Sequence, residues 1–203
     1  MESELRLSGD ADKARLILGE NIKNTGDNIY SSLALLDLYD GDCESALKNI
    51  NIAYPDDSPM DGDLMLLKAK INMLCGKKNI AFKYYQEAIE YCSIEIRNNP
   101  EDYSLLSKLG IAHACTGNKS MVIKNGTGAV EIAASENDAM IVPERIFDLA
   151  RIYCMVGENE QCIQLIEKLT AIGSPFSIHI VFLDPDFKDI RNDERIVELR
   201  EEI

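Results

Sequence analysis

The sequence predicts an all-α protein built as a solenoid of antiparallel helix hairpins. The first observation is a glycine that recurs at intervals of 32, 35, 41 and 40 residues along the 203-residue chain. The second is a small residue five positions beyond each glycine, and the third is an apolar, helix-forming segment ahead of four of them. The glycines and their small partners are Gly9, Gly41, Gly76, Gly117 and Gly157, and Ala14, Ala46, Ala81, Val122 and Cys162.

The second helix of each predicted hairpin begins just after its glycine. In the copy from Gly76 to Glu90, Ala81, Tyr85 and Ala88 lie four and three residues apart, so they share one helix face. A face built small, large, small lets a neighbouring helix approach closely at two points. Glycine ends the preceding helix in the left-handed conformation at little cost. We therefore expect one helix to end and the next to start at each glycine.

The first helix of each full hairpin is predicted from the apolar segment that precedes the glycine. These segments cover residues 30–39, 64–74, 105–114 and 146–154. Each has a small residue seven positions before its glycine, where the two helices of a hairpin cross most closely. These four residues are Ala34, Ala69, Gly110 and Ala150.

Two features depart from the regular pattern. The helix that contains Ala88 is expected to continue to Asn99, just before Pro100, which makes it longer than the repeat requires. Gly126 stands where a large residue is usual in the second helix. The neighbouring helix should therefore come closer at Gly126 or leave a gap there.

The C-terminal residues are expected to cap the array, since the last hairpin of a helical stack otherwise leaves an apolar face exposed. Asp184 and Pro185 should break the chain, and Phe187 and Ile190 are placed to pack back. The capping helix is expected within residues 193–201, whose apolar side holds Ile196, Val197 and Leu199.

These residues and spacings resemble the tetratricopeptide repeat, a helix hairpin of about 34 residues. The resemblance covers about residues 1–172 and implies a right-handed superhelix of hairpins, here with the C-terminal capping helix. The first copy lacks most of its first helix, so we expect the chain to begin inside a longer array. We treat residues 1–203 as one array, divided into a partial repeat (1–26), four repeats (27–60, 61–101 with the extended helix, 102–140 and 141–173) and a capping segment (174–203).

Residues 108–203 also resemble the terminal tetratricopeptide segment of bacterial multidomain signalling proteins. The matching stretches are 109–112, 148–153, 174–179 and 183–195. Proteins of that kind include class III adenylate cyclases, serine/threonine kinases and winged-helix regulators. The resemblance implies that the chain is the C-terminal sensor or docking part of a bacterial intracellular protein, and we expect it to be cytoplasmic.

Charge and composition narrow the classes of partner. The net charge of −14 disfavours nucleic acid, because binding there depends on Lys and Arg side chains that neutralise phosphates. The sequence has no run of about 18 apolar residues, so we expect no membrane insertion. The six cysteines have no Cys-Xaa-Xaa-Cys spacing, so neither a disulfide framework nor a zinc site is expected. Cys162 is expected to be a small core residue.

Three patterns resemble parts of a phosphate-binding, a calcium-binding or a catalytic site, but each lacks a feature that such a site requires. Residues 117–120 look like the end of a phosphate loop, but Ala112 stands where that loop needs glycine. Residues 56–63 look like a calcium loop, but the oxygen ligands do not alternate as required, and a helix N-cap is the better explanation. The only two histidines, His113 and His179, lie in different helical regions. We therefore expect no enzyme, no catalytic residues, no metal and no cofactor.

The resemblance implies a concave groove lined by the first helix of each hairpin. The predicted groove is part apolar and part cationic, which suits a peptide with apolar anchors and one or two carboxylates. An alternative for each residue is packing between helices or against the array's own tail. The predicted groove residues are Leu35, Tyr39, Lys70, Lys108, Ile111, Phe147, Arg151 and Met155.

The function expected from the sequence is a non-enzymatic protein–protein interaction module with a protein or peptide partner. Some members of the family clamp a C-terminal carboxylate, but the corresponding places here hold Ser31, Leu35 and Leu67, so that mode is not expected. The alternative is a self-associating scaffold, a homo-oligomer whose contact is the open N-terminal face of the truncated copy.

Overall fold

The computed structural model describes residues 11–21, 28–55, 60–136, 141–172 and 177–201. Within these ranges the chain forms helices, turns and loops without a strand, which confirms the all-α class. The predicted turn glycine Gly9 lies outside them. The helices are α2 (Ala11–Asn21), α3 (Asn28–Tyr39), α4 (Cys43–Ala53), α5 (Gly62–Leu74), α6 (Lys78–Asn98), α7 (Tyr103–Thr116), α8 (Lys119–Ser135), α9 (Ile141–Met155), α10 (Asn159–Ala171), α11 (His179–Leu183), the 3₁₀ helix η1 (Pro185–Phe187) and α12 (Glu194–Glu201).

Four successive hairpins form the array, each with two helices that pack on one another: α3 with α4, α5 with α6, α7 with α8 and α9 with α10. The glycine between the two helices of each pair has φ between 77° and 83°, the left-handed conformation that favours glycine. A Cβ atom added at any of these glycines would meet nothing within 4 Å. The glycine is therefore required by backbone conformation and not by lack of space. The four residues are Gly41, Gly76, Gly117 and Gly157.

The small residues of the repeat lie where the helices of each pair meet. The residue five positions beyond each glycine is fully buried in all five copies, including Ala81 and Cys162. In α6, Ala81, Tyr85 and Ala88 are all buried, as the shared face predicts. Cys162 has no exposed surface, which confirms it as a small core residue.

At Gly126, the first helix of the next hairpin packs closely against α8. A Cβ atom at this position would lie 2.8 Å from Leu149 Cδ1 and 3.1 Å from Ile152 Cδ1, both on α9. Gly110 on α7 is equally constrained, since its Cβ would lie 2.6 Å from Ile152 Cδ1. The two glycines together let α9 approach both helices of the preceding hairpin. The close approach, and not a gap, is therefore the outcome at Gly126.

The extended helix predicted before Pro100 is present. Helix α6 has 21 residues and ends at Asn98, with Asn99 as its C-cap. Helix α5 begins after Asp61, whose side chain accepts a hydrogen bond from the Leu64 backbone N–H at 2.9 Å. Asp61 is therefore a helix N-cap, as expected for this acidic stretch.

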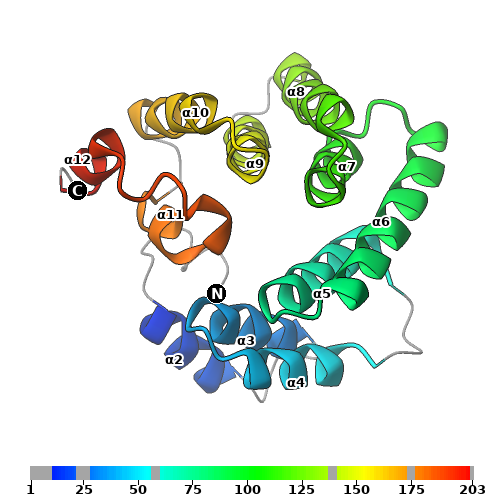
Figure 1. Ribbon diagram of the computed structural model, residues 1–203, viewed down its shortest axis with the longest axis vertical. Coiled ribbons are helices and arrows are strands. Elements are labelled where there is room, and N and C mark those ends of the chain that lie inside the picture. The colour runs from blue at the N-terminus through cyan, green and yellow to red at the C-terminus, as the bar shows by residue number, and fades with distance from the viewer. Residues whose placement is uncertain (1–10, 22–27, 56–59, 137–140, 173–176, 202–203) are drawn as a thin grey trace.

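The hairpins follow a curved path that brings α2 and α3 to the side of the C-terminal segment with α11 (Figure 1). Helix α11 and η1 lie on the inner side of the array, where η1 packs on α9. One apolar cluster unites Ala14 and Leu18 of α2 with residues of α9, α10 and the C-terminal segment, such as Phe187 and Ile190. Ala14 and Leu18 of α2 are buried in this cluster, whereas Leu16 on the same helix is exposed.

The C-terminal cap forms as predicted, with one difference. Helix α12 packs on α10, and Ile196 is fully buried while Leu199 is partly buried against the same cluster. Val197 is 37% exposed and does not share this contact. Phe187 and Ile190 are buried, which confirms that the chain packs back after Asp184 and Pro185.

The expectation of no disulfide is wrong. Cys43, at the start of α4, is bonded to Cys75, the C-cap of α5, with their Cα atoms 5.4 Å apart. Both lie beside turn glycines of successive hairpins, and stacking brings those turns together. A search for closely spaced cysteines misses such a pair, because its partners are 32 residues apart in sequence. The other four cysteines are free.

Candidate functional site

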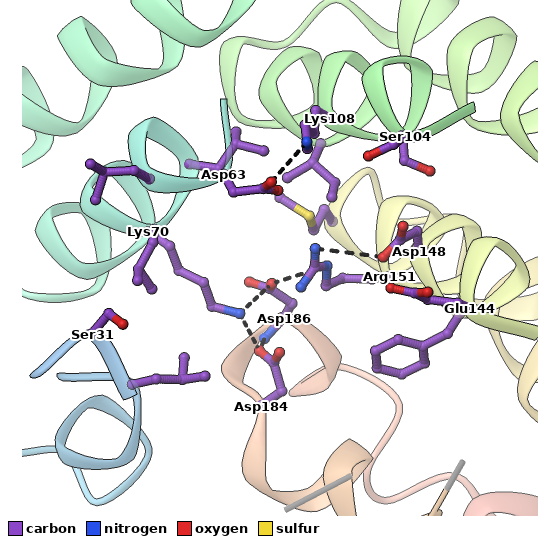
Figure 2. A pocket seen from close by; sticks show the side chains of 18 of the residues that line it. Ser31, Asp63, Lys70, Ser104, Lys108, Glu144, Asp148, Arg151, Asp184 and Asp186 are labelled. Carbon is purple, nitrogen blue, oxygen red and sulfur yellow. Dashed lines mark hydrogen bonds and ion pairs between the residues drawn. The ribbon is translucent and has the colours of Figure 1, made fainter. Parts of the chain in front are cut away.

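The concave side of the array holds a cavity of about 660 Å³. Its lining comes mainly from the inner helices α3, α5, α7 and α9, one from each hairpin, and from the C-terminal segment around η1. Figure 2 shows these elements surrounding the space, with Lys70, Lys108 and Arg151 approaching it from three different helices. The cavity is therefore a product of the array and belongs to no single repeat.

All eight predicted groove residues line this cavity. The apolar ones are Leu35, Tyr39, Ile111, Phe147 and Met155, and the cationic ones are Lys70, Lys108 and Arg151. Ile111 and Phe147 are at the same time buried core residues. The first helices thus present the predicted side chains to one space, while the binding role of these residues stays a prediction.

The chain's own C-terminal segment occupies one wall of the cavity. Lys70 Nζ lies 2.6 Å from Asp184 Oδ1 and 2.7 Å from Asp186 Oδ2 (Figure 2). Arg151 Nε lies 3.9 Å from Asp186 Oδ2, and the Tyr39 hydroxyl donates a hydrogen bond to Asp184 Oδ2 at 3.2 Å. Two of the three predicted cations, Lys70 and Arg151, are therefore paired with the C-terminal segment, as the alternative of packing against the tail allowed.

Asp184 is held in its charged form although it is only 2% exposed. Burial raises its pKa, but attraction to Lys70 and Arg151 outweighs burial, so the pKa lies below the ordinary value. Burial and the negative charge of Asp184 raise the pKa of Tyr39 well above its ordinary value. The tyrosine is therefore a hydroxyl donor to a carboxylate acceptor.

Local structure explains how Asp184 reaches the cavity. Its side chain accepts the Asp186 backbone N–H at 3.0 Å, and Pro185 takes the first position of η1, where no backbone N–H is needed. Arg191 fixes the turn by donating to the Val181 and Asp184 carbonyl oxygens at 3.0 and 2.8 Å. The aspartate is thus an N-cap and an ion-pair partner at once.

An aromatic pair anchors the same segment to α9. The ring centroids of Phe147 and Phe187 lie 5.4 Å apart, with the planes tilted by 34°. Phe187 has no exposed surface. An aromatic pair at this distance adds to the stability that burial alone provides. The segment is therefore held to α9 by an apolar contact as well as by charge.

The rest of the cavity wall has further ion pairs, one between two helices and three within α9. Lys108 Nζ of α7 lies 2.8 Å from Asp63 Oδ2 of α5. On α9, Arg145 approaches Glu144 at 2.8 Å and Asp148 at 3.1 Å, and Arg151 approaches Asp148 at 3.9 Å. Burial lowers the pKa of Arg151, but Asp148 and Asp186 raise it to a net value above the ordinary one, so this guanidinium is charged.

Sequence reasoning missed Asp184 and Asp186 as parts of the site. Both were expected to belong to a break and a cap, and the cap prediction was sound. The missed signal was chemical complementarity between two parts of the chain. Residues 184–187 carry two carboxylates and an aromatic ring, and the groove has the cations Lys70 and Arg151 and the ring of Phe147. Their contact spans more than a hundred residues, so no local pattern indicates it.

In the described part of the chain, no group of three His, Cys, Asp or Glu side chains is arranged to hold a metal ion. None of the described helices is long and apolar enough to cross a membrane.

Comparisons with known proteins were made for the whole chain. No family model matches it, and no curated protein matches it. Among solved structures it is similar to the C-terminal part of a TPR repeat-containing protein from Cytophaga hutchinsonii, at 14% sequence identity and a TM-score of 0.38. The match covers 98% of this chain and 76% of that one.

Proposed function

We propose that this chain is a non-enzymatic protein-interaction module that binds a segment of a partner protein in its concave cavity. The observation that supports this most directly is the origin of the lining, since α3, α5, α7 and α9 each contribute side chains to one space. Repeat arrays offer extended concave surfaces of this kind to their partners.

The size and chemistry of the cavity support a peptide segment as the occupant. A volume of about 660 Å³ accommodates several side chains but not a folded domain. Leu35, Leu66 and Met155 offer apolar surface, and Ser31 and Ser104 lie in the same lining. Binding sites of this size commonly combine mainly apolar walls with a few polar groups that fix orientation.

The non-enzymatic character of the module is part of this proposal, since helical-repeat arrays typically act as interaction scaffolds with concave binding surfaces. The bacterial signalling context and the cytoplasmic location that the resemblance implies belong to this proposal as well.

The test is selection of binders from a phage-displayed library of random dodecapeptides, followed by measurement of Kd by fluorescence polarisation. Ser104→Trp, in the first turn of α7, fills part of the cavity and should weaken binding about tenfold or more. Ser135→Trp, on the exposed end of α8, is the matched control and should leave Kd unchanged. Equal Kd values for the two variants would place binding outside the cavity.

Self-association is the second candidate, favoured by two exposed apolar side chains near the N-terminal end. Leu16 on α2 is 64% exposed and Tyr30 on α3 is 39% exposed. Multi-angle light scattering across a concentration series should show a dimer that Leu16→Lys abolishes. A monomer at every concentration would remove this candidate.

A further inference from the structure

The positive and negative side chains of the cavity differ in their exposure to solvent. The four cationic ones, Lys70, Lys108, Arg145 and Arg151, are each 9–22% exposed and each lie within 4 Å of a carboxylate oxygen. The exposed charges of the described lining are all acidic. They are Asp61, Asp63, which is 73% exposed, and Glu144, which is 44% exposed.

The C-terminal segment sets this polarity. Asp184 and Asp186 supply two of the six carboxylates in the described lining, against four cations, so the cavity has an excess of negative charge. Without these two aspartates the lining would be balanced. The lining that comes from the hairpins alone is therefore balanced in charge, and the C-terminal segment makes the cavity acidic.

An acidic partner would have to remove this segment before it reached Lys70. Removal would expose Phe187 and Ile190, which are buried, and would separate Phe187 from Phe147. It would also leave Lys70 without either carboxylate. The segment is part of the apolar core, so a partner meets the cavity with the segment in place.

We propose that the cavity binds a cationic segment of a partner protein, one that presents Lys or Arg side chains beside apolar ones. This rests on the proposed function and names the partner class of the same site. Asp63 and Glu144 would accept hydrogen bonds from the cationic groups, and Leu66 and Met155 would contact the apolar ones.

The charge of the whole chain agrees with a cationic occupant. The net charge is −14, so the field of the protein attracts a cation and repels an anion before contact.

The test compares two variants that remove the same charge from different places. Asp63→Asn with Glu144→Gln neutralises the exposed carboxylates of the cavity, and Glu90→Gln with Glu131→Gln neutralises two exposed carboxylates on α6 and α8 outside it. Asp61 is left intact because it caps α5. Peptides from the selection on the wild-type chain are the probes.

We expect the selected peptides to be enriched in Lys and Arg, and the cavity double variant to raise Kd about fivefold or more. The control double variant should change Kd by less than about twofold. Enrichment of acidic peptides would overturn the cationic partner while leaving a cavity-binding function standing. Equal losses in the two double variants would also overturn it, because the effect would then be net charge alone. Selected peptides whose Kd is unaffected by Ser104→Trp would instead contradict the proposed function.

Discussion

Lys70 Nζ lies 2.6 Å from Asp184 Oδ1, although the two residues are 114 positions apart in the sequence. The pair joins α5, in the second full hairpin, to the segment that begins η1. Asp184 is only 2% exposed and Lys70 is 14% exposed, so water screens the pair weakly. Breaking such a pair on one side leaves a poorly solvated charge, which is the costly case for buried ion pairs.

We therefore expect Asp184→Asn to lower the free energy of unfolding by about 1–3 kcal/mol, since Lys70 keeps Asp186 as a second partner. Asp186→Asn should cost less, about 1 kcal/mol, because Asp186 is more exposed and Asp184 remains. Urea denaturation followed by circular dichroism measures both. A greater loss for Asp186→Asn would show that Asp184 is not the main partner of Lys70.

The stability that Asp184 provides should depend on pH in one direction. Its pKa in the folded chain lies below the ordinary value, so the folded state favours the charged carboxylate. Its contribution is fully present above the unfolded pKa of about 4 and is lost as pH falls through the folded pKa. The difference in unfolding free energy between wild type and Asp184→Asn should be constant above about pH 5 and should shrink on further acidification. A difference that grew on acidification would contradict the direction of this shift.

Phe187 should be the most sensitive apolar residue of the C-terminal segment. Phe187→Ala removes a fully buried ring that packs on Phe147 and should cost about 3–5 kcal/mol. Val197→Ala, at a 37% exposed position of α12, is the control and should cost less than about 0.5 kcal/mol. Thermal and urea unfolding of the two variants measure the difference, and similar losses would mean that the segment is only loosely packed.

Two glycines on α8 should respond in opposite ways to the same substitution. Gly126→Ala places a Cβ atom 2.8 Å from Leu149 Cδ1 and should destabilise by about 1–3 kcal/mol. Gly128→Ala places its Cβ atom 3.7 Å from Leu106 Cδ1, an ordinary contact, and should stabilise by about 0.5–1 kcal/mol through helix propensity. Differential scanning calorimetry would show the Tm move down in one variant and up in the other. An upward shift for both would indicate that α9 moves away freely.

The repeat itself was predictable from sequence because its determinants are local. Each hairpin needs a glycine at positive φ in its turn and a small buried residue five positions later. Gly76 and Ala81 are one such pair, and both lie within the same short stretch of sequence. The cavity residues followed from the same register, since Lys70, Lys108 and Arg151 each face inward from equivalent helices. Periodicity therefore predicted which side chains meet in the cavity.

The contacts of the C-terminal segment were not predictable in this way. Whether Asp184 meets Lys70 depends on the total curvature of four hairpins, which accumulates from small rotations at each interface. Close approach of α9 at Gly110 and Gly126 is one such contribution. The Cys43–Cys75 bond was missed for a related reason, because its partners belong to different repeats. Its available signal was the position of both cysteines within two residues of a turn glycine.

Closure of the array by its own tail changes how the chain should fold and unfold. Stacked repeats contact only their neighbours, so their ends can fray and re-form one hairpin at a time. Here the C-terminal segment contacts α5 through the Lys70–Asp184 pair and contacts α2 through a shared apolar cluster. Unfolding of either end would therefore break contacts that stabilise the other end. We expect a single cooperative unfolding step in place of progressive fraying. We also expect a slow final phase of folding, since this closure needs most of the array to be in place before its ends can meet.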